Sequence, residues 1–547
     1  MLRGLMGDQP LLVSMCIQHA ARNHADTEIV SRTVEGPIHR YNYAEAESRA
    51  RRVAKALQRL GIRPGDRVAT MAWNTYRHFE LYHGISGIGA VCHTINPVLS
   101  DEQITYIFNH AADRLLFLEK SFVPLVERLR PQLPPDLRIV LLSEAETRLA
   151  TEAGYEDLVA AETDEFTWPQ FDERSACALC YTSGTTGKPK GVLYSHRSTM
   201  LHAFGASLPG ALAMGAADVV CPVVPMFHVC GWATPYTAPM NGTKLVYPGP
   251  KLDGASLYEL FEAEGVTLGL GVPTVWLNFN NYLRDNNKKT TTLRGVVSGG
   301  TAVPLSLLQA YEARGVTMLH AWGMTEMSPL GTTAALKAKH HRLDGAEQTR
   351  IRLTQGRPIL GVEMKIVDDN LKSLPHDGKA VGELLVRGPW IASAYYNDDE
   401  ATRSAVEPDG WFHTGDVASI DPDGYVRLTD RRKDVIKSGG EWISSIDLEN
   451  AAMAHEAVAE AAVIAIPHPK WDERPLLLVT ARPGLRPERD DIIALLAKRF
   501  PKWMLPDDVV VLDELPHTGT GKVMKTRLRE MFRDYQPQPE TEPAAAP

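Results

Sequence analysis

The sequence predicts an α/β protein with a large N-terminal domain of parallel α/β subdomains plus a small β-barrel, and a small, mobile α+β domain at its C-terminus. Three observations lead to this prediction. The chain has 547 residues, and a single hydrophobic core stops growing near about 250–300 residues. Short apolar runs alternate with helical patterns in the first half of the chain. After Gly361 this pattern is replaced by alternating polar and apolar residues.

The first half repeats the order strand, helix, strand, with short turns between them. A largely helical pattern covers 11–60; its clearest amphipathic run is 43–57, and Gly61 follows as a cap. Buried strands that alternate with helices are typical of parallel sheets. We therefore expect a parallel sheet covered by helices on both faces. Its strands are predicted at 68–72, 89–94, 114–118, 138–142, 219–224, 244–247 and 296–298.

Polar and apolar residues alternate beyond Gly361, which predicts the strands of a small β-barrel or antiparallel sheet over about 360–430. The region that follows predicts a compact α+β module. Its helices are expected at 446–455 and 490–500, and its strands near 461–466, 476–480 and 509–512. We therefore expect an N-terminal domain at 1–432, a C-terminal lid domain at 433–536, and a disordered tail rich in Pro, Glu and Ala at 537–547.

Composition and charge argue against several classes of protein. The 58 Lys and Arg residues and the 67 Asp and Glu residues give a net charge of −9, without a basic tract, so no nucleic-acid partner is expected. Cys177 and Cys180 lie in an apolar strand without a second pair at metal-ligand spacing. The apolar run 11–17 is too short to span a bilayer. We expect buried free thiols, a cytoplasmic location and no integral membrane association.

A glycine-rich segment at 181–191 lies between two predicted strands, 176–181 and 191–194. Glycine lets the backbone approach an anion, and amide, hydroxyl and ammonium groups are donors for polyphosphate oxygens. The segment is not a Walker loop, because Pro189 stands where that loop needs glycine. A simple turn is the alternative. The residues of this predicted phosphate loop are Thr182, Ser183, Gly184, Thr185, Thr186, Gly187, Lys188 and Lys190.

The segment 320–326 follows a strand predicted at 316–319, and α/β sheets bind ligands where parallel strands end. Glu326 is an oxygen ligand suited to Mg²⁺, Thr325 is a phosphate donor, and Trp322 has an aromatic face for a base. The alternative is that Trp322 belongs to the core and Glu326 is a solvated loop residue.

Other charged groups suit a nucleotide or an acid. Asp416 follows a tight turn, where a carboxylate can accept hydrogen bonds from ribose hydroxyls. Lys522 lies in a glycine-flanked loop, for which an exposed loop lysine is the alternative. The five charges at 430–434 are compatible with a solvated turn.

The segment 181–191 resembles the AMP-binding signature of the adenylate-forming enzymes, the superfamily of acyl-CoA synthetases, peptide-synthetase adenylation domains and luciferases. The other segments resemble that superfamily's motifs over almost the whole chain. The resemblance implies an ATP-dependent acid–thiol ligase, in which a carboxylic acid forms an acyl-adenylate with release of pyrophosphate and is transferred to CoA with release of AMP. ATP, Mg²⁺ and CoA are the implied cofactors, and we expect a homodimer.

The resemblance also implies roles for single residues. The catalytic residues would be Lys522, Thr325, Glu326 and His228, with Glu326 on the metal and Lys433 as the hinge. The pocket for the acid would be formed by His228, Trp232, Gly299, Gly323 and Pro329. Nucleotide and CoA contacts are implied for Gly299, Gly300, Thr301, Ala321, Trp322, Gly323, Met324, Asp416, Arg431, Lys437, Gly439, Gly440, Glu441 and Trp442. The superfamily usually has tyrosine where Trp322 stands.

Within the superfamily, the segments 438–444 and 467–475 look most like those of medium- and long-chain fatty acyl-CoA ligases and of 3-methylmercaptopropionate-CoA ligases. A thioether sulfur is soft and apolar like a methylene, so one pocket could take a short- or medium-chain fatty acid or 3-methylmercaptopropionate. Three alternatives stay open: a noncatalytic nucleotide-binding protein, a carrier-protein acceptor, and a luciferase-like oxygenase. The presence of Lys522, Glu326 and Asp416 together argues against the first.

Overall fold

The computed structural model describes residues 1–182, 188–431, 434–438, 441–517, 523–533 and 535. The chain divides into two compact units. The predicted domain boundary at 432/433 stays a prediction, and the predicted tail at 537–547 lies outside the described residues. The first unit comprises Met1–Val303, Leu307–Met364 and Val386–Phe412, and the second comprises Pro304–Ser306, Lys365–Leu385 and His413–Pro547.

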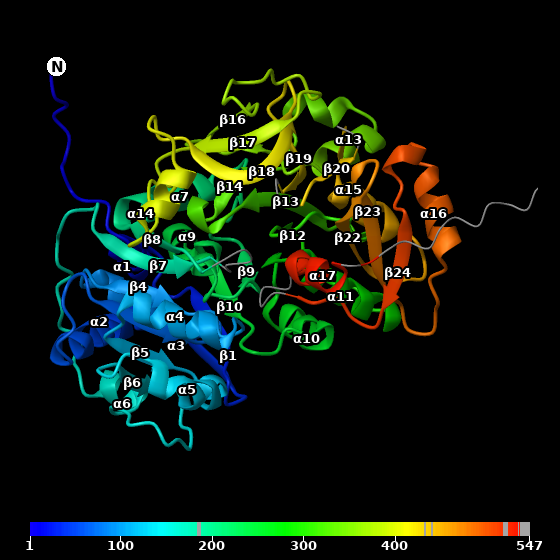
Figure 1. Cartoon of the computed structure of the whole chain (residues 1–547). Helices are drawn as coiled ribbons and strands as arrows, with labels where there is room; N and C mark the ends of the chain where they lie inside the picture. The colour runs from blue at the N-terminus through cyan, green and yellow to red at the C-terminus, as the bar shows by residue number, and fades with distance from the viewer. Residues whose placement is uncertain (183–187, 432–433, 439–440, 518–522, 534, 536–547) are drawn as a thin grey trace, which may run out of the picture. The chain divides into compact units, whose positions relative to one another are not determined.

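A six-stranded sheet in the first unit has the strand order β6-β5-β3-β4-β7-β8 (Figure 1). Neighbouring strands are parallel except for the last pair, β7 and β8, which is antiparallel. The strands predicted at 68–72, 89–94, 114–118 and 138–142 are confirmed. The strands are β3 (Arg67–Met71), β4 (Val91–Thr94), β5 (Leu115–Leu118), β6 (Arg138–Leu141), β7 (Ala176–Tyr181) and β8 (Gly191–Ser195).

A nine-stranded sheet in the same unit has the order β15-β14-β13-β12-β11-β9-β10-β1-β2. The strands from β13 to β1 are parallel, and antiparallel strands complete both edges. The strands are β1 (Glu28–Arg32), β2 (Ile38–Asn42), β9 (Val219–Pro222), β10 (Lys244–Tyr247), β11 (Leu268–Gly271), β12 (Gly295–Ser298), β13 (Thr317–Gly323), β14 (Leu330–Thr333) and β15 (Arg357–Pro358).

The helical pattern predicted over 11–60 is wrong in its middle, where the chain forms the hairpin β1–β2. The partner that buries β1 on its other side is β10, in parallel register with Ile29 opposite Leu245. The local sequence around β1 cannot indicate a partner strand that lies more than 200 residues away. The amphipathic helix predicted at 43–57 is confirmed as α2 (Tyr43–Arg59), which starts with a reciprocal capping box between Asn42 and Glu45.

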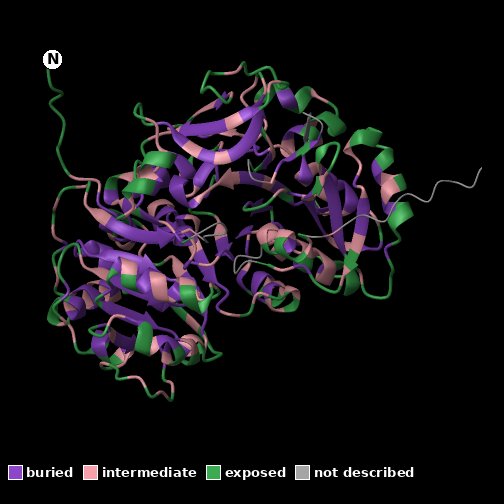
Figure 2. Ribbon diagram, in the orientation of Figure 1, coloured by how far each residue is buried: buried purple, intermediate pink, exposed green. Residues whose placement is uncertain are grey.

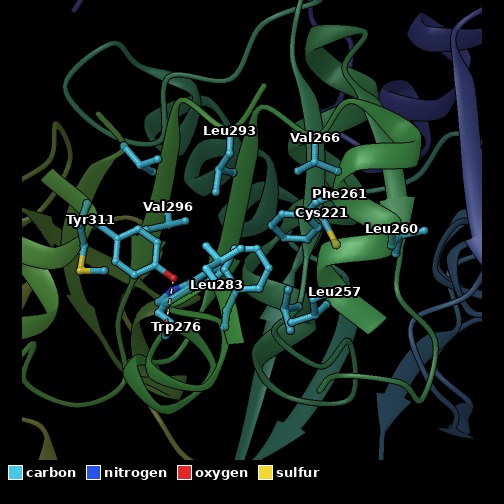
Figure 3. Packing of buried hydrophobic residues seen from close by; sticks show 14 of the residues in the cluster. Cys221, Leu257, Leu260, Phe261, Val266, Trp276, Leu283, Leu293, Val296 and Tyr311 are labelled. Carbon is cyan, nitrogen blue, oxygen red and sulfur yellow. Dashed lines mark hydrogen bonds between the residues drawn. The ribbon is translucent and has the colours of Figure 1, made fainter. Parts of the chain in front are cut away.

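Helices pack on the nine-stranded sheet through one large apolar cluster (Figure 3). Trp276 and Phe279 of α11 (Pro273–Asp285) are fully buried there, as is Val296 of β12. The Tyr311 hydroxyl, also in this cluster, donates a hydrogen bond of 2.9 Å to the Trp276 carbonyl. The strands of both large sheets are mostly buried, as Figure 2 shows, because helices cover them. This rigid packing holds the ends of the parallel strands in place.

The remaining α-helices up to residue 405 mostly alternate with strands along the chain, as the α/β prediction requires. They are α1 (Ser14–Asn23), α3 (Tyr76–Gly87), α4 (Asp101–Ala111), α5 (Val123–Leu129), α6 (Tyr155–Ala160), α7 (His196–Ser207), α8 (Val229–Trp232), α9 (Thr234–Asn241), α10 (Gly254–Glu264), α12 (Leu305–Glu312), α13 (Gly345–Arg352) and α14 (Asp399–Ala405).

The region predicted as a small barrel or antiparallel sheet forms a four-stranded sheet in the order β16-β17-β18-β19. A turn at 422–424 joins the last two strands, which are antiparallel. Gly424 has a φ of +87°, which glycine adopts without a steric penalty. The strands are β16 (Glu363–Val367), β17 (Gly382–Arg387), β18 (Phe412–Ile420) and β19 (Val426–Arg431).

The predicted C-terminal α+β module has the strand order β21-β20-β23-β22, with β24 parallel to β23. Its two predicted helices, α15 and α16, share one apolar cluster with the sheet. Among the described residues, no helix combines the length and the apolar character that crossing a membrane requires. The elements are β20 (Ile436–Ser438), β21 (Glu441–Ile443), α15 (Ser445–Ala452), β22 (Val458–His468), β23 (Asp472–Ala481), α16 (Arg489–Ala497), β24 (Asp508–Leu512) and α17 (Lys525–Met531).

Candidate active site

The predicted phosphate loop connects the antiparallel strands β7 and β8, so both its ends lie side by side. The Thr182 N–H donates to the Lys190 carbonyl at 3.0 Å, and the Lys190 N–H donates to Thr182 Oγ1 at 3.1 Å. The exposed Lys188 has its ammonium 5.4 Å from the centre of the Tyr106 ring. The base of the loop is therefore fixed by hydrogen bonds. Five predicted phosphate contacts lie outside the described residues: Ser183, Gly184, Thr185, Thr186 and Gly187.

The segment 320–326 differs from the prediction, which placed its strand at 316–319. β13 continues to Gly323 and forms an antiparallel hairpin with β14, so Ala321 and Trp322 are strand residues. A Cβ atom on Gly323 would lie 1.8 Å from the Pro329 carbonyl oxygen. The close crossing of these two backbones is therefore possible only with glycine. Met324 then leads into a single 3₁₀ turn, Thr325–Met327.

Glu326 lies in this turn and its side chain is buried, with the residue only 5% exposed. Its Oε1 accepts a hydrogen bond of 2.6 Å from the Tyr395 hydroxyl. The backbone of the turn is held as well, because the Tyr194 hydroxyl donates to the Thr325 carbonyl at 2.6 Å and the Ala392 N–H donates to the Glu326 carbonyl at 2.8 Å. The turn therefore presents a carboxylate whose orientation is set by its neighbours.

Tyr395 also contacts Lys190, a residue of the predicted phosphate loop. The Lys190 ammonium lies 4.8 Å from the centre of the Tyr395 ring, within the range of a cation–π contact. The next residue, Tyr396, donates its N–H to the Gly191 carbonyl at 2.8 Å. Burial and the nearby Glu326 carboxylate raise the pKa of the Tyr395 phenol, which therefore stays protonated and donates. Tyr395 was not among the predicted site residues, since nothing in the local sequence pattern marks it.

Four of the residues predicted around the acid form two close pairs, Trp232 with Gly299 and Gly323 with Pro329. A Cβ on Gly299, just after β12, would be 2.8 Å from the Ala321 carbonyl oxygen and 3.2 Å from the Trp232 indole. Gly323 and Pro329 are the two residues that cross in the β13–β14 hairpin. Gly300 and Thr301 follow on the surface, with a φ of +91° at Gly300.

The turn that carries Trp232 has an unusual backbone. Residues 229–233 all have positive φ, between 45° and 61°, so α8 is a left-handed turn, preceded by His228. Left-handed geometry costs a residue other than glycine about 1–2 kcal/mol. Strain of this kind persists only where packing enforces it, and it concentrates at functional sites.

The second unit brings together two residues predicted to bind the ribose. Asp416 and Arg431 are cross-strand partners in β18 and β19, and Arg431 Nε lies 3.4 Å from Asp416 Oδ1. Asp416 is 5% exposed. The exposed Lys437 donates its backbone N–H to Glu473 at 2.8 Å, and β20 pairs with β21, which contains Glu441 and Trp442. The predicted residues Lys433, Gly439, Gly440 and Lys522 lie outside the described residues.

The carboxylate of Glu326 fits a magnesium ion that travels with a nucleotide. Within the described ranges, no group of three or more His, Cys, Asp or Glu side chains is arranged to hold a metal by itself. Mg²⁺ in nucleotide sites is bound through one or two carboxylates together with phosphate oxygens. All six cysteines are free and buried, as predicted.

Comparison with known proteins extends these observations to the whole chain. The profile of the AMP-binding enzyme family matches residues 17–396, and that of the AMP-binding enzyme C-terminal domain matches 447–522. A 3-methylmercaptopropionyl-CoA ligase of Ruegeria lacuscaerulensis is 49% identical over 97% of this chain and 99% of its own. A medium-chain-fatty-acid–CoA ligase of Ectopseudomonas oleovorans is 47% identical over 98% of both chains. The solved anthranilate CoA ligase bound to anthranoyl-AMP superposes with a TM-score of 0.84 at 25% identity, over 95% of this chain and 97% of that one.

Proposed function

Because the chain belongs to the AMP-binding enzyme family as an acyl-CoA ligase, we propose that it joins a short- or medium-chain fatty acid or 3-methylmercaptopropionate to CoA, using Mg²⁺ and ATP. One observation carries the chemical part of this proposal. Tyr395 contacts both a lysine of the predicted phosphate loop, Lys190, and the buried carboxylate of Glu326. Mg·ATP needs hydrogen-bond donors for its phosphates and an oxygen ligand for its metal. A phosphate loop beside an oriented carboxylate supplies both.

The first half-reaction activates the acid. An oxygen of the substrate carboxylate attacks the α-phosphorus of ATP, and the bond to the pyrophosphate leaving group breaks. Thr325 and Lys522 would donate to the α-phosphate, and residues 182–190 would hold the β- and γ-phosphates. Glu326 would hold Mg²⁺, which neutralises phosphate charge when bound. A lysine between the two anions offsets their repulsion as they approach.

The second half-reaction transfers the acyl group. The CoA thiol loses its proton to solvent, and the thiolate sulfur attacks the acyl carbon of the adenylate. The bond from this carbon to the phosphate oxygen breaks, and AMP leaves. We propose that the C-terminal domain turns about Lys433 between the two steps, so that the segment 437–442 replaces Lys522. A few backbone torsions are enough for such a hinge motion. Asp416 and Arg431 would bind the ribose, which is supported by their ion pair on adjacent strands.

The choice of acid is supported by the two relatives whose names specify a 3-methylmercaptopropionyl and a medium-chain fatty acyl substrate. The apolar indole of Trp232 beside Gly299 suits either acid, because a thioether sulfur resembles a methylene in size and polarity. His228 would lie at the mouth of this pocket. A difference of one methylene changes binding by only about 1–3 kcal/mol, so overlapping specificity is expected.

The experiment is to mix the purified protein with Mg·ATP and acids from acetate to dodecanoate, together with 3-methylmercaptopropionate, and to follow AMP with and without CoA. We expect sustained AMP formation only when both an acid and CoA are present. Lys522→Ala should lower the adenylation rate by about 10²–10³-fold. AMP release that needs no CoA, or the same rate after the substitution, would refute the proposal.

Two further features belong to the proposal. A cytoplasmic location is supported by the six free, buried thiols, since reducing compartments keep cysteines unpaired. A homodimer is the expected assembly, and light scattering of the purified protein during size-exclusion chromatography tests it directly. A monomer mass near 60.3 kDa would show that expectation to be wrong.

A further inference from the structure

Tyr395 lies between two groups to which the proposed chemistry gives opposite charge. Its hydroxyl donates to Glu326 Oε1 at 2.6 Å, and its ring faces the Lys190 ammonium at 4.8 Å. The residue is 8% exposed, so both contacts are shielded from water. Its own backbone is fixed, because its N–H donates to Thr402 Oγ1 at 2.9 Å and its ring packs edge-on against Phe412.

We propose that Tyr395 is a positioning residue for the metal and the phosphate loop: its hydroxyl fixes the Glu326 carboxylate for Mg²⁺, while its ring holds the Lys190 ammonium toward the same phosphates. This rests on the proposed function, which places Mg·ATP at Glu326. The residue itself need not touch the nucleotide.

The physical reason lies in the freedom of the two partners. A glutamate and a lysine both have long side chains with many rotamers, and ordering them on binding costs free energy. A hydrogen bond to one carboxylate oxygen fixes the direction of the group before the metal arrives. Removing a group that hydrogen-bonds to a metal-ligating side chain typically lowers metal affinity or activity by about 10–100-fold. The cation–π contact attracts the Lys190 ammonium to the Tyr395 ring, and this attraction is stronger where water is excluded.

The test compares three variants of the full-length protein. Tyr395→Phe removes only the hydroxyl, and Tyr395→Leu removes the ring as well. Tyr311→Phe is the matched control, since this buried tyrosine also donates one hydrogen bond, to the Trp276 carbonyl in the apolar cluster. For each variant, the dissociation constant of ATP is measured by calorimetric titration over a series of free Mg²⁺ concentrations, together with the melting temperature.

For Tyr395→Phe we expect the Mg²⁺ concentration at half-maximal ATP affinity to rise about 10-fold, while ATP affinity at saturating Mg²⁺ stays near that of the wild type. Tyr395→Leu should weaken ATP binding at every Mg²⁺ concentration. Tyr311→Phe should lower the melting temperature and leave the Mg²⁺ dependence unchanged. A Mg²⁺ dependence in Tyr395→Phe equal to that of the wild type overturns the proposal.

This experiment uses equilibrium binding of ATP, so its result does not depend on the acid or on CoA. A wild-type protein that binds ATP with Mg²⁺ but releases no CoA-dependent AMP would refute the proposed function. A shifted Mg²⁺ dependence of ATP binding in Tyr395→Phe would still support the Tyr395 assignment in that case. The opposite pattern, normal turnover with an unchanged Mg²⁺ dependence in Tyr395→Phe, would refute the assignment alone.

Discussion

Trp232 and Gly299 approach each other so closely that the indole Cη2 would stand 3.2 Å from a Cβ atom at position 299. Trp232 belongs to a left-handed turn before α9, and Gly299 follows β12, so the two reach this place from distant parts of the chain. The Ala321 carbonyl oxygen is also close to the same Cβ position, at 2.8 Å. Gly299 is therefore required by space rather than by backbone torsion.

Gly299→Ala should shorten the range of acids that the enzyme accepts. The added methyl group must displace the indole of Trp232 or the backbone at Ala321, and either shift narrows the proposed pocket. We expect kcat/KM for the longest accepted acid to fall about 10-fold, with little change for the shortest. The measurement is kcat/KM over a homologous series of straight-chain acids.

Gly345→Ala is the matched control for that series. Gly345 begins α13 and a Cβ there would meet no atom within 4 Å, so its profile should equal the wild type. If Gly299→Ala lowers kcat/KM equally for all chain lengths, Gly299 does not line the pocket for the acid.

Trp232→Ala should have the opposite effect. Removing the indole opens space beside Gly299, so longer acids should gain relative to shorter ones by about 10-fold in kcat/KM. The control is Trp503→Ala, a tryptophan that is 44% exposed in the C-terminal module. The idea fails if the ratio of long-chain to short-chain activity is the same in Trp232→Ala and in the wild type.

His202 should make stability depend on pH below neutrality. Its buried Nε2 accepts the Leu330 N–H at 3.1 Å, beside the turn that carries Glu326, and burial lowers the pKa of His202 to about 3. In the unfolded state His202 has a pKa near 6.5, so below that pH it binds a proton that it does not bind in the folded state. The contribution of His202 to the free energy of unfolding is therefore fully present above pH 6.5. It is lost progressively as the pH falls from about 6.5 to about 3, and the loss is about 2 kcal/mol at pH 5.

His202→Gln tests this, because a glutamine oxygen can accept the same N–H and does not titrate. We expect its melting temperature to fall less than that of the wild type between pH 7 and pH 5, although other buried histidines lower both. Equal falls in the two proteins would show that His202 does not titrate between these pH values.

Lys525 should be a large contributor to the stability of the C-terminal module. It begins α17, and its ammonium lies 2.6 Å from Glu449 Oε1 and also donates to the Ser445 hydroxyl; both members of the ion pair are about 85% shielded. Lys525→Met leaves the Glu449 carboxylate buried without its counter-ion, which typically costs about 3–5 kcal/mol. Calorimetric melting should show this loss.

The double variant Lys525→Met, Glu449→Met should regain part of that stability, since the Glu449 charge is no longer left unpaired. The buried Asp430 carboxylate, which Lys525 also attracts, still lacks this cation in the double variant. The control on the same helix is Arg527→Met, which breaks an exposed pair with Glu530 and should change stability by less than about 1 kcal/mol. A double variant no more stable than Lys525→Met would show that the loss comes from packing rather than from charge.

The strands of the parallel sheets could be predicted from the sequence because each is a short apolar run bounded by turns, as at β3 and β12. Burial on both faces leaves that pattern in the sequence. The hairpin β1–β2 could not be predicted, because its partner β10 lies far along the chain. The end of β13 was placed too early for a similar reason, since the last residues pair only with β14.

The sequence by itself determined the α/β class, the glycine-rich segment that we propose as a phosphate loop, and the chemical types of the residues proposed for catalysis. These depend on composition and short-range spacing. Only the tertiary structure decided that Tyr395 joins Lys190 to Glu326, and that Trp232 faces Gly299. Both relationships connect residues separated by at least 67 positions, and they exist only once the sheets and loops have packed. Contacts of this range depend on the fold as a whole, and no local pattern in the chain records them.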